Sequence, residues 1–241
     1  MANVGIISQV RMSSTRLPGK VLKEVKGKIL LDYHLDRLLE SGYKVIVATT
    51  TNDADNVIES HCRSREINVF RGSEDDVLER FYLAAKENHL DVIVRVTSDC
   101  PLIDGNLLKQ EIDSYVQKRD FSIYKSNCQK RTFPRGFDFE IFSFNSLERA
   151  HKEATLTSDR EHVTPYIWKG NIKDIKFQDV LRSEDKSDYR ITVDTIEDYN
   201  LILELIGKFD CEKLNADQII EILNNNKQLV EINQSIEQKK V

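Results

Sequence analysis

Short apolar runs alternate with stretches of helical periodicity through the first half of the chain. The runs that predict buried strands are Val4–Ser8, Lys44–Thr49, Ile67–Phe70 and Asp91–Thr97. They are separated by amphipathic stretches that predict helices at residues 29–41, 53–64 and 74–88, the last with Ser73 as its expected N-cap and Asp76 in its first turn. Strands that alternate with helices of this length form right-handed βαβ units. The pattern therefore predicts a doubly wound α/β fold, with a mostly parallel sheet and helices on both faces.

The second half of the chain is less regular. Strands are predicted at Phe121–Tyr124 and Gly136–Phe142, and in the latter Asp138 and Glu140 alternate with apolar residues and share one face. Further helices are expected at 145–153, 159–169 and after residue 196, and further strands near 171–177 and 189–193. We expect one domain over residues 1–241, with a core of about 1–120 and 171–210, an inserted lobe of about 121–170 and a polar helical tail of about 211–241.

Composition narrows the class of protein. The chain has 241 residues, 40% of them hydrophobic, which is enough for one large core. Its 35 basic and 40 acidic side chains leave a net charge of −5, which argues against a nucleic-acid binder, because such a protein needs a basic face. No run reaches the roughly 20 apolar residues of a membrane helix, and the N-terminus lacks the basic leader of a secretory signal. The four cysteines form no CxxC pair, so we expect reduced thiols in a cytoplasmic protein.

A loop of small and basic residues directly follows the first predicted strand. Residues 11–20 read RMSSTRLPGK and supply hydroxyls and cations from Arg11, Ser13, Ser14, Thr15, Arg16 and Lys20. In a doubly wound sheet, ligands bind beyond the carboxyl ends of the strands, and Arg forks and a Lys ammonium match phosphate oxygens. The loop follows neither the Walker nor the GxGxxG order. From the residues alone, a triphosphate-binding loop and a solvated basic turn both stay open.

Two aspartates stand at the ends of predicted strands. Asp99 follows the fourth strand of the first half, and Asp194 follows the strand near 189–193. Mg²⁺ takes one or two carboxylates and completes its shell with water and substrate phosphates, so the pair suits a one- or two-metal site. Alternatively, Asp99 is a turn residue before a proline, and Asp194 flanks a helix that Thr195 and Asp198 cap.

Several segments, taken in order, resemble a known family. They are RMSSTRLPGKVL, FRGSEDDVLERF, VRVTSDCPLID, RTFPRGFDFEIF, SDREHVTPYIW and RITVDTIED. Together they resemble the spore coat polysaccharide biosynthesis protein F group of the acylneuraminate cytidylyltransferase family, which is related to the synthetases of CMP-ketodeoxyoctonate and CMP-sialic acid. The likeness runs from residue 5 to about residue 205 and so covers most of the chain.

The resemblance implies a nucleotidyltransferase-type fold, with a mixed, mostly parallel sheet and a small inserted dimerisation lobe. It implies transfer of CMP from CTP to an acidic or modified sugar with release of pyrophosphate, for surface polysaccharide or glycan synthesis. Mg²⁺ is the implied cofactor. A homodimer is also implied, and its expected contact is an apolar face in residues 121–170.

The resemblance also assigns roles to individual residues. Nucleotide binding falls on Arg11, Ser13, Ser14, Thr15, Arg16, Lys20, Arg71 and Ser98. Catalysis falls on Arg11, Lys20 and Asp99, and metal binding on Asp99 and Asp194. Acceptor binding falls, more loosely, on Asp138, Glu140, Arg160 and His162. The chain departs from the family at Val10, where alanine is usual, at Ser13, where glycine is usual, and at Arg135, where an acidic residue is usual.

Alternative assignments stay open. The run Arg160–His162 also suits a charged helix start, and Asp138 and Glu140 also suit an ordinary exposed strand face. The same fold would serve another donor, such as UTP or dTTP, or an alditol or sugar phosphate acceptor. A glycosyltransferase would usually carry a DxD motif, which this chain lacks after its strand at 91–97, and a non-catalytic pathway subunit would not need these charges. The remaining histidines lack ligand spacing and are expected at surfaces or boundaries, namely His34, His61, His89 and His151.

Overall fold

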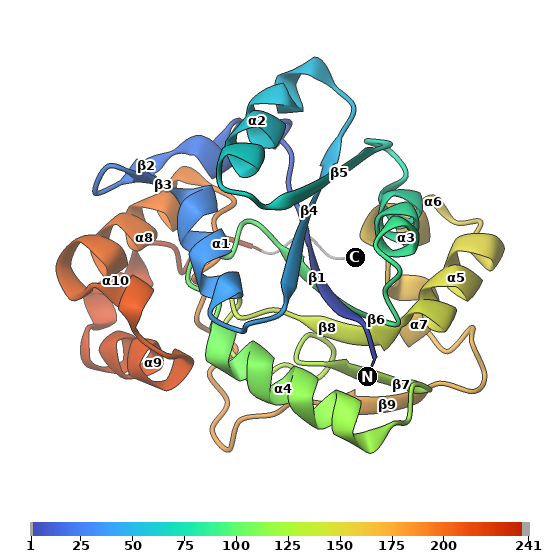
Figure 1. Cartoon of the computed structure of the whole chain (residues 1–241). Coiled ribbons are helices and arrows are strands. Elements are labelled where there is room, and N and C mark those ends of the chain that lie inside the picture. Colours follow the sequence, from blue (N-terminus) through green and yellow to red (C-terminus); the bar gives the residue numbers. More distant parts are fainter. Residues whose placement is uncertain (1, 238–241) are drawn as a thin grey trace.

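A computed structural model describes residues 2–237, whose strands form one seven-stranded sheet and a separate small hairpin (Figure 1). The strands of the sheet are β1 (Val4–Gln9), β4 (Lys44–Thr50), β5 (Asn68–Gly72), β6 (Val92–Thr97), β7 (Ile123–Ser126), β8 (Glu140–Ser143) and β9 (Lys176–Asp179). Their order is β5-β4-β1-β6-β8-β7-β9. Neighbouring strands run parallel except at β8, which is antiparallel to both β6 and β7. The hairpin consists of β2 (Glu24–Val25) and β3 (Lys28–Ile29).

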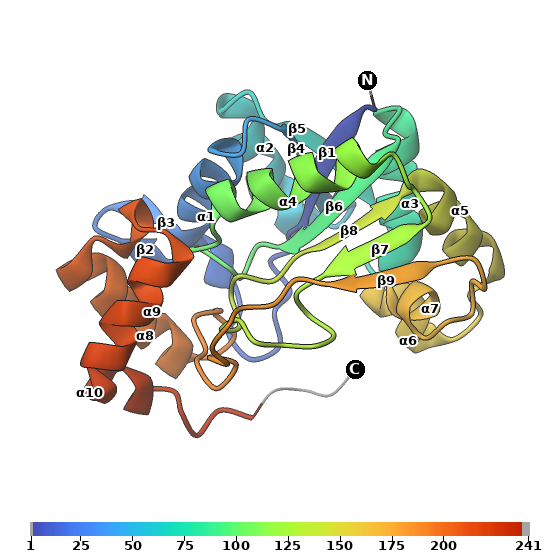
Figure 2. The ribbon, with the colours of Figure 1, turned by 90° about the horizontal axis from the view of Figure 1, so that it is seen from below.

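Helices cover both faces of the sheet, as Figures 1 and 2 show together. One face carries α1 (Leu30–Leu39), α2 (Asn56–Ser64) and α4 (Gly105–Lys118). Beside the hairpin, α8 (Ile196–Phe209), α9 (Ala216–Asn225) and α10 (Lys227–Glu231) extend the same core. The other face carries α3 (Val77–Glu87), α5 (Phe144–Glu153), α6 (Thr157–His162) and α7 (Pro165–Trp168). Within β6, Val92, Val94 and Val96 join the first core and Ile93 joins the second. This alternation is typical of a strand that is buried on both faces.

The structure confirms the α/β class and every strand and helix predicted in the first half, with shifts of a few residues at their ends. The start of α3 differs from the prediction. Asp76, rather than Ser73, is the N-cap, because its carboxylate accepts a hydrogen bond from the Glu79 N–H at 2.9 Å. Ser73 instead accepts from the Asp76 N–H at 3.0 Å and so supports the cap from outside the helix.

Residues 121–170 do not stand apart as an inserted lobe. They add β7 and β8 to the main sheet and α5–α7 to its second face. The predicted strand Gly136–Phe142 is shorter than expected, since only Glu140–Ser143 is strand. The predicted strand near 171–177 lies a few residues later, at Lys176–Asp179.

The predicted helix at 159–169 is interrupted at Val163. This buried residue has φ 72° and ψ −56°, and the Thr164 N–H donates to the His162 carbonyl at 2.8 Å. These values describe a γ-turn, which is strained for a β-branched residue. The turn separates α6 from α7.

The predicted strand near 189–193 is extended chain with a single bridge, between Arg135 and Arg190. It lacks a continuous partner, because its backbone bonds go to two different loops: the Ile191 N–H donates to the Arg135 carbonyl at 2.7 Å, and the Val193 N–H donates to the Asp99 carbonyl at 2.7 Å. The segment therefore ties the loop after β6 to the chain before α8.

The C-terminal segment buries more apolar side chains than a polar helical tail would. In α9, Ile219, Ile220 and Leu223 are buried in the first core. The segment is therefore part of the domain rather than an appended tail. Among the described residues, no helix is long and apolar enough to cross a membrane. The four cysteines are all unpaired.

Candidate active site

A cleft of about 560 Å³ opens at the carboxyl ends of β1 and β6. Its size lies within the ~300–1,000 Å³ of small-molecule sites. Its walls come from the loop after β1, the start of α3, the loop after β6, the chain before β8, the end of α6 and the chain before α8. The lining residues are Gln9, Val10, Arg11, Ser14, Thr15, Arg16, Lys20, Val77, Arg80, Arg95, Thr97, Ser98, Asp99, Arg135, Asp138, Glu161, His162, Thr192 and Asp194.

The loop of residues 11–20 is held by specific contacts. The Met12 N–H donates to the buried Asp55 carboxylate at 2.8 Å, and that carboxylate also accepts hydroxyls from the end of β4. Gly19 adopts φ 65°, a left-handed conformation that favours glycine, and its N–H donates to the Met12 carbonyl at 3.1 Å. The resulting turn carries Lys20 into the cleft.

Lys20 brings the two predicted aspartates together. Its Nζ lies 3.1 Å from Asp99 Oδ2, 2.9 Å from Asp194 Oδ1 and 2.7 Å from the carbonyl oxygen of Val193. Arg16 also reaches Asp194, at 2.9 Å. The cations of the loop and the carboxylates of two distant segments therefore share one cleft.

Asp194 is held in place from behind by a buried cluster. Asp198 is fully buried and accepts hydrogen bonds from the backbone N–H groups of Asp194 (2.9 Å) and Thr195 (3.1 Å). Its carboxylate also pairs with Arg190 at 2.8 Å and accepts the amide of Asn233 at 2.8 Å. Thr195 and Asp198 form the predicted capping box of α8. The cap and the cleft position of Asp194 therefore coexist.

The cluster in the cleft stays ionised. Burial opposes ionisation of Asp99, but the charge of Lys20 and hydrogen bonds from Thr97, Lys20 and Cys100 lower its pKa to about 2. Burial likewise opposes protonation of Lys20, but Asp99 and Asp194 together raise its pKa above its ordinary value. At neutral pH the site therefore presents the Lys20 ammonium beside the Asp99 carboxylate.

The donor set fits a hard divalent cation. The carboxylates of Asp99 and Asp194 lie on either side of the Lys20 ammonium and both line the cleft, and carboxylate oxygens suit Mg²⁺. Within residues 2–237, no cluster of three or more His, Cys, Asp or Glu side chains could hold a metal alone. A metal here would therefore take ligands from the substrate as well, as Mg²⁺ does at phosphate-transfer sites.

Most residues assigned to the nucleotide line this cleft, namely Arg11, Ser14, Thr15, Arg16, Lys20 and Ser98. Two do not, and their assignment is corrected. The hydroxyl of Ser13 turns away and donates to Glu74. The guanidinium of Arg71 donates to the carbonyls of Thr50 and Asn52, both at 2.8 Å, and pairs with a glutamate of α2. Arg71 therefore stabilises the loop after β4 rather than contacting the cleft.

Two of the four residues assigned to the acceptor, Asp138 and His162, line the cleft. Asp138 pairs with Arg131, and burial lowers the pKa of His162. Glu140 is buried rather than on an exposed strand face, because its carboxylate accepts the hydroxyls of Tyr124 and Thr164 and pairs with Arg95. The acceptor assignment of Glu140 is therefore wrong.

Arg160 is also absent from the cleft. Its guanidinium pairs with Asp76 at 2.6 Å and donates to the carbonyls of His151 and Ala154 at 3.1 Å. It fixes α6 against the start of α3, which agrees with the alternative of a charged helix start. Its neighbour Glu161 lines the cleft instead.

The sequence reasoning missed several residues that line the cleft or support it. Arg95 carried a signal, since a cation in the centre of the apolar run of β6 needs a buried partner. Arg80 carried none, because an arginine within a helix usually faces solvent. His34 was expected at a surface or boundary and is fully buried. Its Nδ1 donates to the Cys100 carbonyl and its Nε2 accepts from Ser8 Oγ, both at 2.8 Å, and burial lowers its pKa to about 4. It therefore ties α1 to the loop that carries Asp99.

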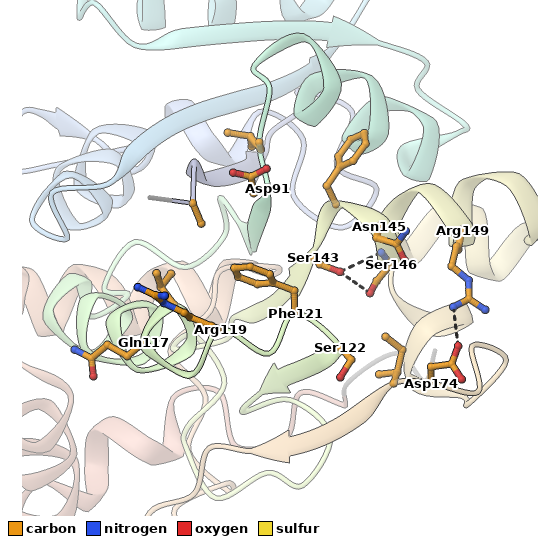
Figure 3. A pocket seen from close by; sticks show the side chains of 15 residues that line it. Asp91, Gln117, Arg119, Phe121, Ser122, Ser143, Asn145, Ser146, Arg149 and Asp174 are labelled. Carbon is orange, nitrogen blue, oxygen red and sulfur yellow. Dashed lines mark hydrogen bonds and ion pairs between the residues drawn. The ribbon is translucent and has the colours of Figure 1, made fainter.

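A second cavity, of about 1170 Å³, lies at the opposite end of the strands (Figure 3). Its walls include the start of β6, the end of α4 and the start of α5, with Phe121 and Phe144 among the lining residues. Some of its polar groups are paired with one another: Ser143 bonds Ser146 at 2.9 Å, and Arg149 bonds Asp174 at 3.5 Å. Because it offers no cluster of free charges, the cleft at the carboxyl ends is the better candidate for chemistry.

A cationic loop after β1 and two carboxylates at the carboxyl edge of a mixed α/β sheet define a nucleotidyltransferase-type enzyme. Comparison with known proteins gives the family. The sequence model of the cytidylyltransferase family matches residues 4–240, and the chain belongs to this family.

Relatives match the chain along nearly its whole length. An uncharacterized protein of Methanocaldococcus jannaschii is 39% identical over 99% of this chain and 97% of its own. The spore coat polysaccharide biosynthesis protein SpsF of Bacillus subtilis is 32% identical over 94% of this chain and 96% of its own. A solved cytidylyltransferase of Leptospira borgpetersenii superposes with a TM-score of 0.91 at 36% identity and full coverage of both chains. Solved CMP-2-keto-3-deoxy-manno-octonic acid synthetase shares the fold, with a TM-score of 0.63 at 13% identity over 86% of this chain and 99% of that one.

Proposed function

We propose that this chain transfers CMP from CTP to a hydroxyl group of an acidic or modified sugar and releases pyrophosphate, for surface polysaccharide or glycan synthesis. The observation that carries the proposal is the contact of Lys20 with both Asp99 and Asp194 in a cleft beside the loop of residues 11–20. The family supports CTP as the donor. The spore coat relative supports the polysaccharide setting.

The reaction needs charge stabilisation more than covalent chemistry. The acceptor oxygen bonds to the α-phosphorus of CTP as the bond from that phosphorus to the pyrophosphate oxygen breaks, and the hydroxyl proton is lost. Catalysis of such a transfer depends mainly on positioning and on neutralising phosphate charge. Arg11, Arg16 and Lys20 are the cations of the cleft that would hold the phosphates and balance the charge on the departing pyrophosphate.

Asp99 and Asp194 are the residues that would hold Mg²⁺. When bound, the ion would neutralise the α-phosphate and lower the pKa of the attacking hydroxyl. The charge of Lys20, with hydrogen bonds from Thr97 and Cys100, keeps Asp99 in its charged form. The capping box of α8 keeps the backbone of Asp194 in place.

The other wall of the cleft would receive the sugar. It carries Arg135, Asp138, Glu161 and His162. Among the described residues, Arg135 has no ion-pair partner, whereas Asp138 pairs with Arg131. A guanidinium without a protein carboxylate suits an acceptor that brings its own negative charge.

The test is to incubate the full chain with CTP, Mg²⁺ and a panel of acidic and amino sugars, and to search for a CMP-linked product by mass spectrometry. Parallel reactions with ATP, GTP and UTP, followed by pyrophosphate release, establish the donor. Pyrophosphate release that needs CTP, a sugar and Mg²⁺ together supports the proposal. A chain that is folded and inactive with every pair of substrates, or that prefers another nucleotide, would contradict it.

A further inference from the structure

Arg80 is a buried arginine without a counterion. Its side chain is 1% exposed and lines the cleft from the first turns of α3. Within the described part of the chain its only hydrogen bond is from Nη1 to the Ser73 carbonyl, and Nε has no partner at all. A buried charged donor left unpaired costs free energy, so its presence needs an explanation.

The other buried arginines in the described chain do not share this property. Arg37 pairs with Glu40 at 2.8 Å, and Arg190 pairs with Asp198 at 2.8 Å. Arg95, also in the cleft, pairs with Glu140. Arg80 therefore differs from these arginines in having no carboxylate partner.

Carboxylates do lie near Arg80, but each is committed elsewhere. Asp55 accepts the Met12 N–H at 2.8 Å and the hydroxyls of β4. Glu74 lies 3.6 Å from Arg11, and Asp76 pairs with Arg160 at 2.6 Å. The acceptor that would satisfy Arg80 is therefore expected from outside the protein.

The backbone is shaped to admit this side chain. β5 ends on Gly72, and a Cβ at that position would come within 3.0 Å of Arg80 Cγ and 3.1 Å of the Phe70 ring. A side chain larger than glycine would crowd the stem of Arg80. Although burial and the nearby Arg11 lower the pKa of Arg80 to about 10, the guanidinium stays charged at neutral pH.

The surroundings of Arg80 differ from those of Lys20. The charged groups that act on Lys20 are Asp99 and Asp194, whereas those that act on Arg80 include Arg11 and Asp55, from the β1 and β4 side of the cleft. The side chains of Val10 and Val77 line the cleft as well. The part of the cleft around Lys20 thus suits phosphates and a metal, whereas the lining also includes two valines and Arg80, whose Nε has no partner.

We propose that Arg80 binds the edge of the pyrimidine base and thereby selects CTP over UTP. This inference rests on the proposed function, since it takes CTP as the donor. A flat ring suits apolar walls, and cytosine presents two neighbouring acceptors, O2 and N3, to a guanidinium that can only donate. Uracil carries a hydrogen on N3, so its N3–H donor would face the N–H donors of the guanidinium, and no hydrogen bond could form there. A buried polar group left unpaired by the wrong ligand is an effective source of discrimination.

The experiment measures binding, so that no acceptor sugar is needed. The full chain is titrated by calorimetry with CTP, UTP and tripolyphosphate, each with Mg²⁺. We expect the wild type to prefer CTP over UTP by about 5- to 150-fold, the discrimination of one good bidentate contact. In Arg80→Met the CTP Kd should rise by a similar factor, while the UTP and tripolyphosphate values change by less than about twofold. Arg160→Met, an arginine outside the cleft, is the matched control and should keep the wild-type preference.

Stability gives a second readout. Since Arg80→Met removes a buried charge that has no carboxylate partner, the Tm of the nucleotide-free variant should stay equal or rise, and a fall would indicate a structural role. Should Arg80→Met fail to fold, Arg80→Lys keeps the charge without the planar fork and should bring the two nucleotides close to equal affinity.

Other outcomes overturn the inference. An equal loss for all three probes would make Arg80 a phosphate ligand, and unchanged affinities would remove it from the site. Equal wild-type affinity for CTP and UTP would refute the role of Arg80 alone. Absence of binding by any probe to the wild type would refute the proposed function, and this inference with it.

Discussion

Two charge clusters meet at Asp194, and they are built differently. Behind it, Asp198 is fully buried and its carboxylate is saturated by Arg190, Asn233 and two backbone N–H groups. In front of it, the side chains of Lys20, Asp99 and Asp194 remain 11%, 23% and 16% exposed to the cleft. The rear cluster has all its partners from the protein. The front cluster is also paired, since Asp194 contacts Lys20, Arg16 and Arg190, but its side chains stay open to the cleft, where a ligand can reach them.

The difference shows how to separate structural from functional charge in this protein. A carboxylate whose partners are all supplied by the protein fixes the backbone, and its loss should destabilise the fold. A carboxylate that faces a cleft, held in its charged form, should affect chemistry more than folding. Substitutions in the two clusters should therefore have opposite signatures.

The largest effect is expected in the rear cluster. Asp198→Asn removes one of the two carboxylates that pair with the buried Arg190, Asp194 being the other, and weakens the acceptor of two backbone N–H groups; it should lower the free energy of unfolding by about 3–5 kcal/mol. Urea unfolding followed by circular dichroism measures this. Asn233→Ala, which removes a single neutral hydrogen-bond donor to the same carboxylate, is the matched control and should cost about 1 kcal/mol. A small loss in Asp198→Asn would contradict the structural role of the cluster.

In the front cluster the effect should fall on catalysis. Asp99→Asn should reduce turnover by roughly 100- to 1000-fold, about 2.7–4 kcal/mol of transition-state stabilisation, because it removes a charged ligand from the site. The measurement is pyrophosphate release with CTP, Mg²⁺ and the acceptor found in the panel, beside an unfolding curve. Undiminished turnover in the folded variant would remove Asp99 from the metal site.

Acid should also distinguish Asp99. Its pKa is lowered to about 2 in the folded chain, below the value of about 4 expected after unfolding. The stability that its ionised form contributes is therefore present above pH of about 4 and is lost as the pH falls toward about 2. We expect the urea midpoint of the wild type to decline over this window more steeply than that of Asp99→Asn. Parallel curves for the two chains would show that Asp99 has an ordinary pKa.

The smallest effect on ligand binding is expected at Arg71, which belongs to neither cluster. Because its guanidinium holds the loop after β4, Arg71→Gln should cost about 1 kcal/mol of stability. Its affinity for CTP with Mg²⁺ should stay within about twofold of the wild type, by the small effect usual for substitutions away from a site. A tenfold loss of CTP affinity would restore the original assignment of Arg71 to the nucleotide.

The hydrophobic pattern of the sequence predicted those features that depend on neighbouring residues. The strands of the first half alternate between two cores, and this periodicity is visible in the sequence. Asp99 was found because it directly follows such a strand. Asp194 was selected because a strand was predicted directly before it. That prediction is only partly right, since the chain there is extended but makes a single isolated bridge.

The remaining site assignments depended on partners that are distant in the sequence. Nothing near Glu140 in the chain shows that Arg95 and Thr164 will bury its carboxylate, and nothing near Arg160 shows that Asp76 will pair with it. Arg80 was missed for the converse reason, because the absence of a counterion becomes visible only when the whole surroundings are known.

The γ-turn at Val163 has a consequence for how an acceptor would be recognised. A β-branched residue held at φ 72° stores about 1–3 kcal/mol of conformational energy, and it persists only where the surrounding packing leaves no alternative. Glu161 and His162, directly before it, therefore face the cleft from a rigid backbone rather than from a flexible loop. We expect this rigid backbone to restrict the acceptor to a few sugar shapes and to have the same conformation with and without the sugar.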